Sequence, residues 1–276
     1  MTKKGFTLAE VLITLGVIGV VASITLPTLI KEYNKHVWVS ALKENYSLLN
    51  QGFKKMIADD GVEYIADTEV WRSMGEWKPW LRGCDSSNIS SGNCKDFFDQ
   101  LKKYFKITYI GIGSDNYIGS NGTTEMGYKY KYRNSSKEFV DTGKIIYLSN
   151  GAMIWGYNFD IGCSIRSDCD ELYAAGGHMC GRAGHFKIDI NGNRGPNEFG
   201  KDIFMFYITE RGQLAPYGGN DYAMSMAWGS GFSQEKLDQY KAKKGLKGEC
   251  LMGSGMNGGE ACAGLLIDQL NWKMDY

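Results

Sequence analysis

The first sixty residues carry two successive hydrophobic patterns. From Phe6 to Ile30 the chain is apolar, apart from Glu10 and a few small or hydroxyl-bearing residues. From Lys31 onward, large apolar residues recur at three- and four-residue steps, the periodicity of a helix with one buried face. These are Trp38, Leu42, Tyr46, Leu49, Phe53 and Met56. With Gly61 as a helix end, the pattern predicts one long helix, or two helices broken at Pro27.

The apolar run is long enough to cross a membrane. About 25 helical residues span roughly 37 Å, and a bilayer core is about 30 Å thick. Lys3 and Lys4 precede the run, and the positive-inside bias then leaves the N-terminus in the cytoplasm and the remainder outside. The alternative is a secretory signal peptide with a small-residue site at Val20 and Ala22, although the apolar stretch continues well beyond it. Both interpretations export residues 31–276.

Glu10 is the charge inside this run and the sharpest functional clue. A charge within an apolar span costs roughly 2.5–3.5 kcal/mol on insertion scales, so it usually has a partner. Cleavage between Gly5 and Phe6 would free an α-amino group four residues before Glu10. In a helical stack of subunits, that amine could meet a neighbour's Glu10. The alternative is a carboxylate that merely snorkels to the interface.

The stretch KKGFTLAEVLITLGVIGVVASITLP resembles the N-terminal segment of type IV pilins and type II secretion pseudopilins. In that family a prepilin peptidase cuts after the glycine, here Gly5, and N-methylates the new first residue, here Phe6. The family's glutamate, here Glu10, pairs with a terminal amine during filament assembly. Gly19 and Pro27 stand where the family interrupts its helix. The resemblance covers this segment alone and implies an assembly class.

The resemblance also implies a place in the cell and a set of partners. We expect a single-pass protein of the bacterial inner membrane, with its C-terminal domain periplasmic or extracellular, assembled in a type IV pilus or a type II secretion pseudopilus. Expected partners are other pilin subunits, prepilin peptidase and membrane lipid. The expected organisation is a leader at 1–5, an assembly helix at 6–30, an amphipathic helix at 31–60 and a globular domain at 61–276. The alternative function is a minor pilin that acts as a surface adhesin or binds DNA.

The residues after the long helix predict an antiparallel sheet that its amphipathic half would cover. The expected fold class is therefore α+β with disulfide-stapled loops, and this helix-on-sheet arrangement matches the pilin-like fold that the resemblance implies. Residues 143–157 are the clearest hairpin, with two β-rich runs around a two-residue turn at Asn150 and Gly151. Further strands are expected at 186–190 and 203–208, with short helices at 96–105 and 261–274.

Seven cysteines lie beyond the apolar segment, in the part that is expected to be exported, where disulfides form. Their connectivity cannot be deduced from sequence. Local pairs that close short loops are favoured, and each would stabilise the fold by roughly 2–3 kcal/mol in the chain-entropy picture. The favoured pairs are Cys84–Cys94, Cys163–Cys169 and Cys250–Cys262. The last would staple the C-terminal region, as the resemblance also implies.

Charge argues against nucleic acid as a partner. Lysine plus arginine equals aspartate plus glutamate, at 31 each, so the chain has no net field to steer an anion. The run YKYKYR at 128–133 interleaves rings and bases, which suits single-stranded nucleic acid. Its alternation fits better a strand with the tyrosines inward. Trp71, Trp77 and Trp80 could stack on a sugar, but core packing is the simpler reading.

One loop is a candidate for calcium, with no other cofactor expected. Asp189, Asn191 and Asn193 alternate as in calcium loops, Asp202 follows, and calcium takes six to eight oxygen ligands. The alternative is a polar turn between two strands. The Cys and His residues at 163–185 match no standard zinc spacing. Because serine-hydrolase, metalloprotease and P-loop motifs are all missing, the chain is not expected to be an enzyme.

Overall fold

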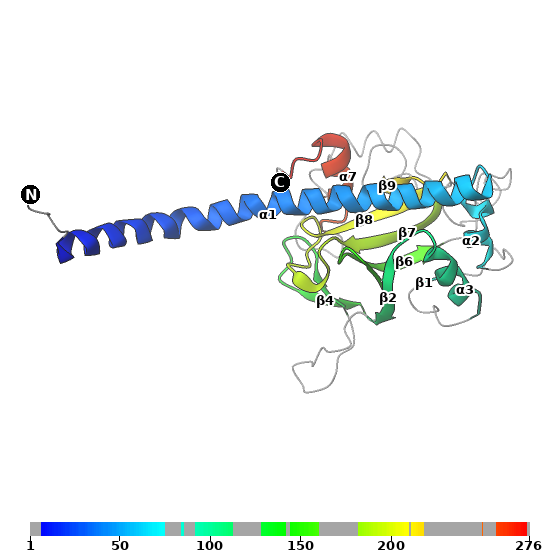
Figure 1. Ribbon diagram of the computed structural model, residues 1–276, viewed down its shortest axis with the longest axis horizontal. Helices are drawn as coiled ribbons and strands as arrows, with labels where there is room; N and C mark the ends of the chain where they lie inside the picture. The colour runs from blue at the N-terminus through cyan, green and yellow to red at the C-terminus, as the bar shows by residue number, and fades with distance from the viewer. Residues whose placement is uncertain are drawn as a thin grey trace, which may run out of the picture.

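The dominant element of the molecule is helix α1 (Leu8–Asp60), which projects far beyond the globular part (Figure 1). At 53 residues, α1 is about 80 Å long at ~1.5 Å per residue. It is one continuous helix, so the alternative of two helices broken at Pro27 is wrong.

The computed structural model describes residues 7–74, 84–85, 92–112, 128–141, 144–159, 182–209, 211–217, 250 and 258–274.

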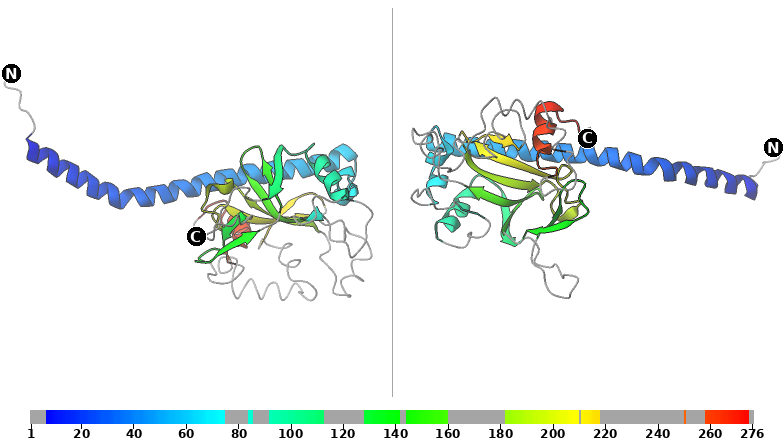
Figure 2. Two further views of the ribbon diagram at one scale, coloured as in Figure 1. Left: turned by 90° about the horizontal axis from the view of Figure 1, so that it is seen from below. Right: turned by 180° about the vertical axis from the view of Figure 1, so that it is seen from behind.

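Two residues shape the course of α1. Pro27 lies inside the helix and removes one backbone hydrogen bond, which is a known cause of bending. The view from below shows that the projecting part of α1 is indeed bent (Figure 2, left). Gly61 ends the helix in the left-handed conformation, with φ +63°, and its N–H donates to Ile57 O and Ala58 O. Glycine adopts this conformation without a side-chain clash, so the expected helix end is confirmed.

The globular part is built on a seven-stranded antiparallel sheet. Its main path runs β2-β5-β6-β7-β8-β9, and β1 pairs with β6. The strands are β1 (Cys84–Asp85), β2 (Ile107–Ile112), β5 (Lys144–Leu148), β6 (Met153–Phe159), β7 (Arg182–Asp189), β8 (Ile203–Thr209) and β9 (Leu214–Pro216). A separate two-stranded sheet pairs β3 (Tyr128–Lys131) with β4 (Glu138–Asp141). The strands expected at 186–190 and 203–208 are confirmed as parts of β7 and β8.

The hairpin of β5 and β6 is confirmed, with a turn one residue longer than expected. Leu148 N–H donates to Ala152 O at 2.9 Å, which leaves three residues, 149–151, in the turn. Gly151 has φ +90°. Three-residue hairpin turns commonly end in a residue with positive φ, as Gly151 does. The turn at Asn150 and Gly151 is therefore confirmed, but its predicted length of two residues is wrong.

The two faces of the main sheet are covered by different elements. Successive side chains of a strand point to opposite faces. In β6, Ile154 belongs to the first core, which lies between the sheet and α1. Trp155 belongs to a second core, which lies between the sheet and the β3–β4 pair. A bulge at Gly156, with φ +53°, then shifts this alternation, so that Tyr157 lies in the first core. The second core consists of Tyr128, Tyr130, Tyr132, Ile145, Met153, Trp155, Phe199 and Ile203.

Helix α1 covers the first face with the apolar stripe that its sequence predicts. Leu42, Leu49, Phe53 and Met56 are at most 2 % exposed. Each large apolar side chain buried in this way contributes roughly 1.5–3 kcal/mol relative to exposure. The globular part therefore packs against one side of the C-terminal half of α1, whose buried stripe contributes to its core (Figures 1 and 2).

Short helices complete the fold. They are η1 (Ile65–Asp67), α2 (Glu69–Arg72), α3 (Gly92–Leu101), η2 (Gly192–Arg194), α7 (Cys262–Gly264) and η3 (Leu265–Gln269). The helix expected at 96–105 is present as α3, but it begins and ends four residues earlier. The helix expected near the C-terminus is α7 continued by the π-helical turn η3, and residues 261–266 are all buried.

Candidate functional site

The N-terminal half of α1 is the candidate assembly surface, because it is apolar yet exposed. Its large apolar side chains, from Leu8 to Ile30, are between 42 % and 79 % exposed. They include consecutive positions such as Leu12 with Ile13 and Val17 with Ile18, so they cover every side of the helix. A helix that is apolar all round is normally buried in protein or in a membrane. Among the described residues, α1 is the helix long and apolar enough to cross a bilayer.

The hydroxyl groups within this apolar half are compatible with lipid. Thr14 Oγ1 donates to Val11 O at 3.0 Å, Ser23 Oγ to Val20 O at 2.8 Å, and Thr25 Oγ1 to Val21 O at 2.9 Å. Each of these three hydroxyls therefore has a partner inside its own helix. A polar group without a partner is costly in hydrocarbon, and these bonds reduce that cost. Glu10 differs because it is the ionisable side chain among residues 8–30, and a charge in an apolar span usually has a partner.

Glu10 is oriented by a capping box with Thr7. The Glu10 carboxylate accepts the Thr7 N–H and the Thr7 hydroxyl at Oε2, both at 2.8 Å, while Thr7 Oγ1 accepts the Glu10 N–H at 3.3 Å. This arrangement satisfies orphan N–H groups at the start of α1. Thr7 was not among the residues predicted to have a role, although the pattern Thr-x-x-Glu before an apolar run is the known sequence signal of a capping box.

The capping box leaves the Glu10 carboxylate able to bind a further donor. A carboxylate can accept about four hydrogen bonds, and two of them go to Thr7. The box also directs the carboxylate back toward the N-terminal end of α1. Gly5 and Phe6, the predicted processing residues, lie outside the described residues. Their roles, and the pairing of Glu10 with a terminal amine, therefore stay predictions.

The other two predicted assembly residues lie in the same exposed half of α1. A Cβ atom added to Gly19 would meet nothing within 4 Å, so no contact with the described residues requires glycine there. Pro27 is accommodated within the helix, as described above. The structure places Glu10, Gly19 and Pro27 along one projecting rod and does not bring them together.

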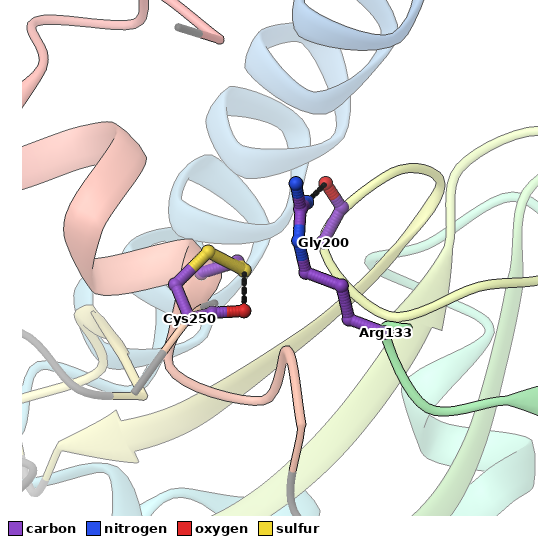
Figure 3. Close-up of a disulfide and its surroundings, with 4 residues drawn as sticks. Arg133, Gly200 and Cys250 are labelled. Atoms are coloured by element: carbon purple, nitrogen blue, oxygen red, sulfur yellow. Dashed lines mark hydrogen bonds between the residues drawn. A yellow bond between two sulfur atoms is a disulfide. The ribbon is translucent and has the colours of Figure 1, made fainter. Parts of the chain in front are cut away.

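One predicted disulfide is confirmed. Cys250 and Cys262 are bonded and fully buried. The bond lies against the β7–β8 loop, since a Cβ on Gly200 would stand 2.5 Å from Cys262 Sγ (Figure 3). Arg133 Nη1 donates to Gly200 O at 3.4 Å beside it. Cys94 is also disulfide-bonded.

Two predicted cysteine pairs remain predictions. Cys163 and Cys169 lie outside the described residues, and so does the side chain of Cys84. The sulfur of Cys94 is in a disulfide, and its pairing with Cys84 stays a prediction. Cys84 itself lies in β1, where its backbone pairs with Phe159.

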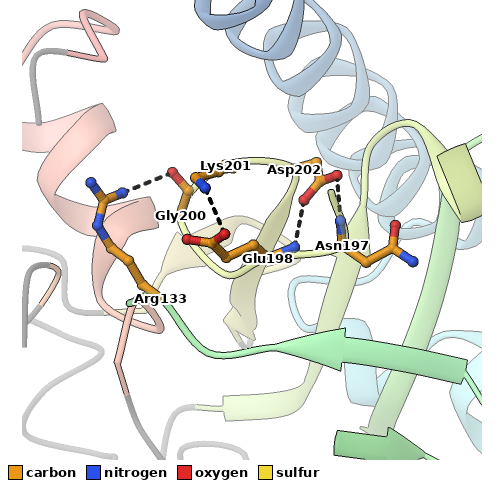
Figure 4. Close-up of polar contacts among 6 residues, drawn as sticks. All are labelled: Arg133, Asn197, Glu198, Gly200, Lys201 and Asp202. Atoms are coloured by element: carbon orange, nitrogen blue, oxygen red, sulfur yellow. Dashed lines mark hydrogen bonds and ion pairs between the residues drawn. The ribbon is translucent and has the colours of Figure 1, made fainter. Parts of the chain in front are cut away.

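The β7–β8 loop brings two predicted calcium ligands together. Asp189, at the end of β7, and Asp202, just before β8, are both fully buried. Asp202 accepts the N–H groups of Asn197 at 2.9 Å and Glu198 at 2.8 Å, which closes the loop on itself (Figure 4). Asp189 accepts the hydroxyl of Tyr128, from β3, and the N–H of Asn191 at 3.0 Å.

Burial controls the protonation of this pair. Burial, and then the nearby charge of Asp202, raise the pKa of Asp189 to about 8. Burial also raises the pKa of Asp202, against the two backbone N–H groups that it accepts. Keeping one proton on the pair avoids two adjacent buried negative charges. The pair therefore acts as a polar link between the β7–β8 loop and β3.

The described residues fit calcium only in part. Both oxygens of each carboxylate already accept a hydrogen bond from protein, and Asn193 is exposed. In favour of a cation, Asn191 Oδ1 is buried without a hydrogen-bond partner. No cluster of three or more His, Cys, Asp or Glu side chains suited to a metal occurs in the described part of the chain. Calcium binding at this loop stays a prediction.

The run YKYKYR begins with β3, which covers its first four residues, and its tyrosines line the second core. Tyr128, Tyr130 and Tyr132 are 1 %, 9 % and 7 % exposed, so they face inward as the strand interpretation predicts. Such rings cannot stack on the bases of a nucleic acid. Trp71 is fully buried in the first core, whereas Trp77 and Trp80 lie outside the described residues. The described residues thus give no support to a nucleic-acid or sugar platform at these positions.

Comparison with known proteins identifies the apolar half of α1. The family model of the prokaryotic N-terminal methylation motif matches residues 1–26. No curated protein and no solved structure matches the chain. The match includes Gly5, Phe6 and Glu10, and it ends just before Pro27. The matched segment is followed by an α+β domain, and the layout of the whole, a long N-terminal helix on an antiparallel sheet, is pilin-like. The chain thus begins with the N-terminal methylation motif, which is the signature of type IV pilins and pseudopilins.

Proposed function

We propose that the protein is a structural subunit of a type IV pilus or a type II secretion pseudopilus. In this proposal, prepilin peptidase cuts after Gly5 and methylates Phe6, and the mature subunits polymerise through the N-terminal half of α1. The observation that carries the proposal is a helix half that is apolar on every side and that the subunit leaves exposed, with Glu10 at its start. Other copies of the same helix would cover this surface in a filament.

The proposal also assigns a location. Before assembly, the bacterial inner membrane would cover residues 6–30, and the globular domain would lie on the periplasmic or extracellular side. The orientation is supported by Lys3 and Lys4 before the apolar run. The disulfide between Cys250 and Cys262 agrees with an oxidising compartment for the domain. A structural subunit needs no catalytic site, and we propose none.

The decisive test is the incorporation of a Glu10→Ala variant into filaments. Removing the carboxylate leaves the neighbour's N-terminal amine without its partner in an apolar environment, so we expect incorporation to fall at least tenfold. The matched control is Glu44→Ala, which removes an exposed carboxylate from the half of α1 that lies on the domain. Unchanged incorporation of Glu10→Ala would count against the proposal.

Mass analysis of the mature N-terminus tests processing independently. A chain that begins with methylated Phe6 agrees with the proposal. A chain that still carries residues 1–5 contradicts the processing step. A chain that begins at Ser23 shows that the apolar run is an ordinary secretory signal, and it removes the assembly helix from the mature protein.

Calcium at the β7–β8 loop is a separate proposal. Its ligands would be Asp189 and Asp202, with Asn191 supplying the buried amide oxygen. A bound cation stabilises the folded state by mass action, so millimolar calcium should raise the melting temperature by several degrees. Asp202→Asn should abolish that rise. An unchanged melting temperature in calcium and in chelator would exclude this site.

A further inference from the structure

The apolar contacts between α1 and the sheet do not by themselves fix how the helix lies. Leu42, Leu49, Phe53 and Met56 form the buried stripe. Hydrophobic attraction is non-directional. It therefore favours burial of the stripe, but it discriminates only weakly between neighbouring rotations and axial positions of the helix. A slip of one helical turn would move α1 by about 5.4 Å along the sheet. Directional contacts must select among such arrangements.

Asn45 provides a directional contact on one side of the stripe. It is only 2 % exposed, although it is polar. Its Oδ1 accepts from Asn150 Nδ2 at 2.9 Å, and its own Nδ2 donates to Ala41 O at 2.9 Å. Asn150 in turn accepts the Ala152 N–H at 3.2 Å, which ties its amide to the β5–β6 turn. Asn150 itself is exposed, but separating the two would leave the buried Oδ1 of Asn45 without its hydrogen bond, at about 1–3 kcal/mol.

Tyr46 and Asn50 provide contacts on the other side of the stripe. Asn50 Oδ1 accepts the Leu214 N–H at 2.9 Å, and the Tyr46 hydroxyl donates to Leu214 O at 3.2 Å. Asn50 Nδ2 also donates to Tyr46 O at 2.8 Å, which holds its amide in this orientation. Both backbone groups of one residue of β9 are thus bonded by side chains of α1, in the position that a further strand would occupy.

The two sets of contacts bracket the stripe. At about 100° per residue, Asn45 lies on one flank of Leu49, and Tyr46 and Asn50 lie on the other. A rotation of α1 in either direction would therefore break one set. Close packing reinforces the position, since a Cβ on Gly52 would stand 2.1 Å from Phe105 Cε1. Buried polar residues are known to select register in packed helices.

We propose that Asn45, Tyr46 and Asn50 are positioning residues that fix the rotation and the axial register of α1 on the sheet. They thereby set the direction in which the exposed half of α1 leaves the domain. In a helical filament, every domain must hold the same orientation relative to its core helix. This consequence rests on the proposed function, whereas the register itself is a property of the single subunit.

The register can be measured in the full-length protein in detergent micelles. Ketone-bearing residues at Ser40, exposed on α1, and at Gln213, exposed beside β9, accept nitroxide labels without involving the cysteines. Pulsed spin-label spectroscopy then gives the distance between the labels. We expect one narrow distance for the parent protein. For Asn45→Leu, and for Tyr46→Phe combined with Asn50→Leu, we expect a second population shifted by about one helical turn, ~5 Å, or a distribution at least twice as wide.

Matched variants separate positioning from stability. Gln51→Leu changes an exposed amide on the same helix and should keep the parent distance. Asn50→Asp keeps an acceptor for the Leu214 N–H and should also keep it. If Asn50→Leu does not fold, Tyr46→Phe alone, which retains the ring, should still broaden the distribution. A lowered melting temperature with an unchanged distance would overturn the proposal. Because this test uses isolated subunits, it can fail while Glu10→Ala still abolishes assembly, and the reverse also holds.

Discussion

The two halves of α1 belong to one helix but differ in the pattern and the exposure of their apolar side chains. In the N-terminal half, the apolar side chains from Leu8 to Ile30 face every direction and are exposed. In the C-terminal half, they form one stripe that is buried beneath the sheet. The first pattern suits surroundings that are apolar on all sides, and the second suits a helix with protein on one side and water on the other. The change in pattern therefore marks where the subunit's own fold begins.

Polar groups show the same division. In the first half, hydroxyl groups bond to their own helix, and Glu10 bonds to Thr7 within the first turn. In the second half, Asn45 and Asn50 bond to residues more than 100 positions away in the sequence. The polar side chains of the first half thus bond within α1 itself, whereas those of the second half bond to distant parts of the domain. Substitutions can test how complete this division is.

Matched leucine truncations should give the largest difference. Leu49→Ala removes a side chain that is 2 % exposed, and we expect a loss of about 2–5 kcal/mol in the free energy of unfolding. Leu15→Ala removes a side chain that is 61 % exposed, and the loss should stay below about 0.5 kcal/mol. Urea unfolding of the full-length protein in detergent, followed by the fluorescence of the buried tryptophans, measures both. Equal losses would show that the first half also packs on the domain.

The stability of the domain should depend on pH through Asp189. Its pKa is raised to about 8 in the folded protein, chiefly by burial, so the folded state keeps a proton that the unfolded chain loses near pH 4. Between the two pKa values, from about pH 4 to about pH 8, the free energy of unfolding is therefore greatest at the low end. It falls as the pH rises, by on the order of 1 kcal/mol per pH unit. Urea unfolding from pH 5 to pH 8 measures the slope.

An Asp189→Asn variant is the control for this slope. The amide cannot ionise, so the contribution of Asp189 should vanish while the Asp202 contacts remain. The N-terminal half of α1 contains no part of this buried pair, so its helicity should not change over the same pH range. A parent protein whose stability rises from pH 5 to pH 8 would contradict the assignment.

A pair of glycine substitutions should produce a smaller contrast. A Cβ on Gly52 would stand 2.1 Å from Phe105 Cε1, so Gly52→Ala must displace the ring, and we expect a loss of about 1–3 kcal/mol. Gly19→Ala meets nothing within 4 Å and should raise the helicity of the first half slightly, since alanine favours helix by about 1 kcal/mol over glycine. Urea unfolding and circular dichroism measure the two effects. A Gly52→Ala protein as stable as the parent would show that Phe105 moves aside freely.

Sequence predicted the fold where the signal was local and periodic. The stripe on α1, the helix end at Gly61, the strands β7 and β8 and the Cys250–Cys262 bond were all anticipated. These depend on spacing within a few residues, or on one short loop. The structure also confirms that the tyrosines of YKYKYR face inward.

Sequence could not show what depends on distant residues meeting. The link between Asn50 and Leu214 joins two segments with no shared pattern, and so does the link between Tyr128 and Asp189. The alternation at 189–193 suggested calcium ligands, but it could not reveal that Asn193 would be exposed while Asp202 folded back beside Asp189. The role of Thr7 was different, because its signal was present in the sequence and was overlooked.

The smallest predicted effect concerns the first turn of α1. Thr7→Val keeps the shape of the side chain but removes the hydroxyl that accepts the Glu10 N–H and donates to the Glu10 carboxylate. Loss of an N-cap costs about 0.5–2 kcal/mol, so hydrogen exchange at the start of α1 should become several-fold faster. The effect should be confined to this end, and the melting temperature of the domain should not change.

Mass-resolved hydrogen exchange of the processed protein in lipid nanodiscs measures this effect. The matched control is Thr14→Val, whose hydroxyl bonds back to Val11 O and caps no N–H group. If exchange at the first turn is the same in Thr7→Val as in the parent, then the capping box is not what orders the Glu10 carboxylate. The N-terminal amine would then have to orient Glu10, and the first half of α1 would depend on a partner from its first residue onward.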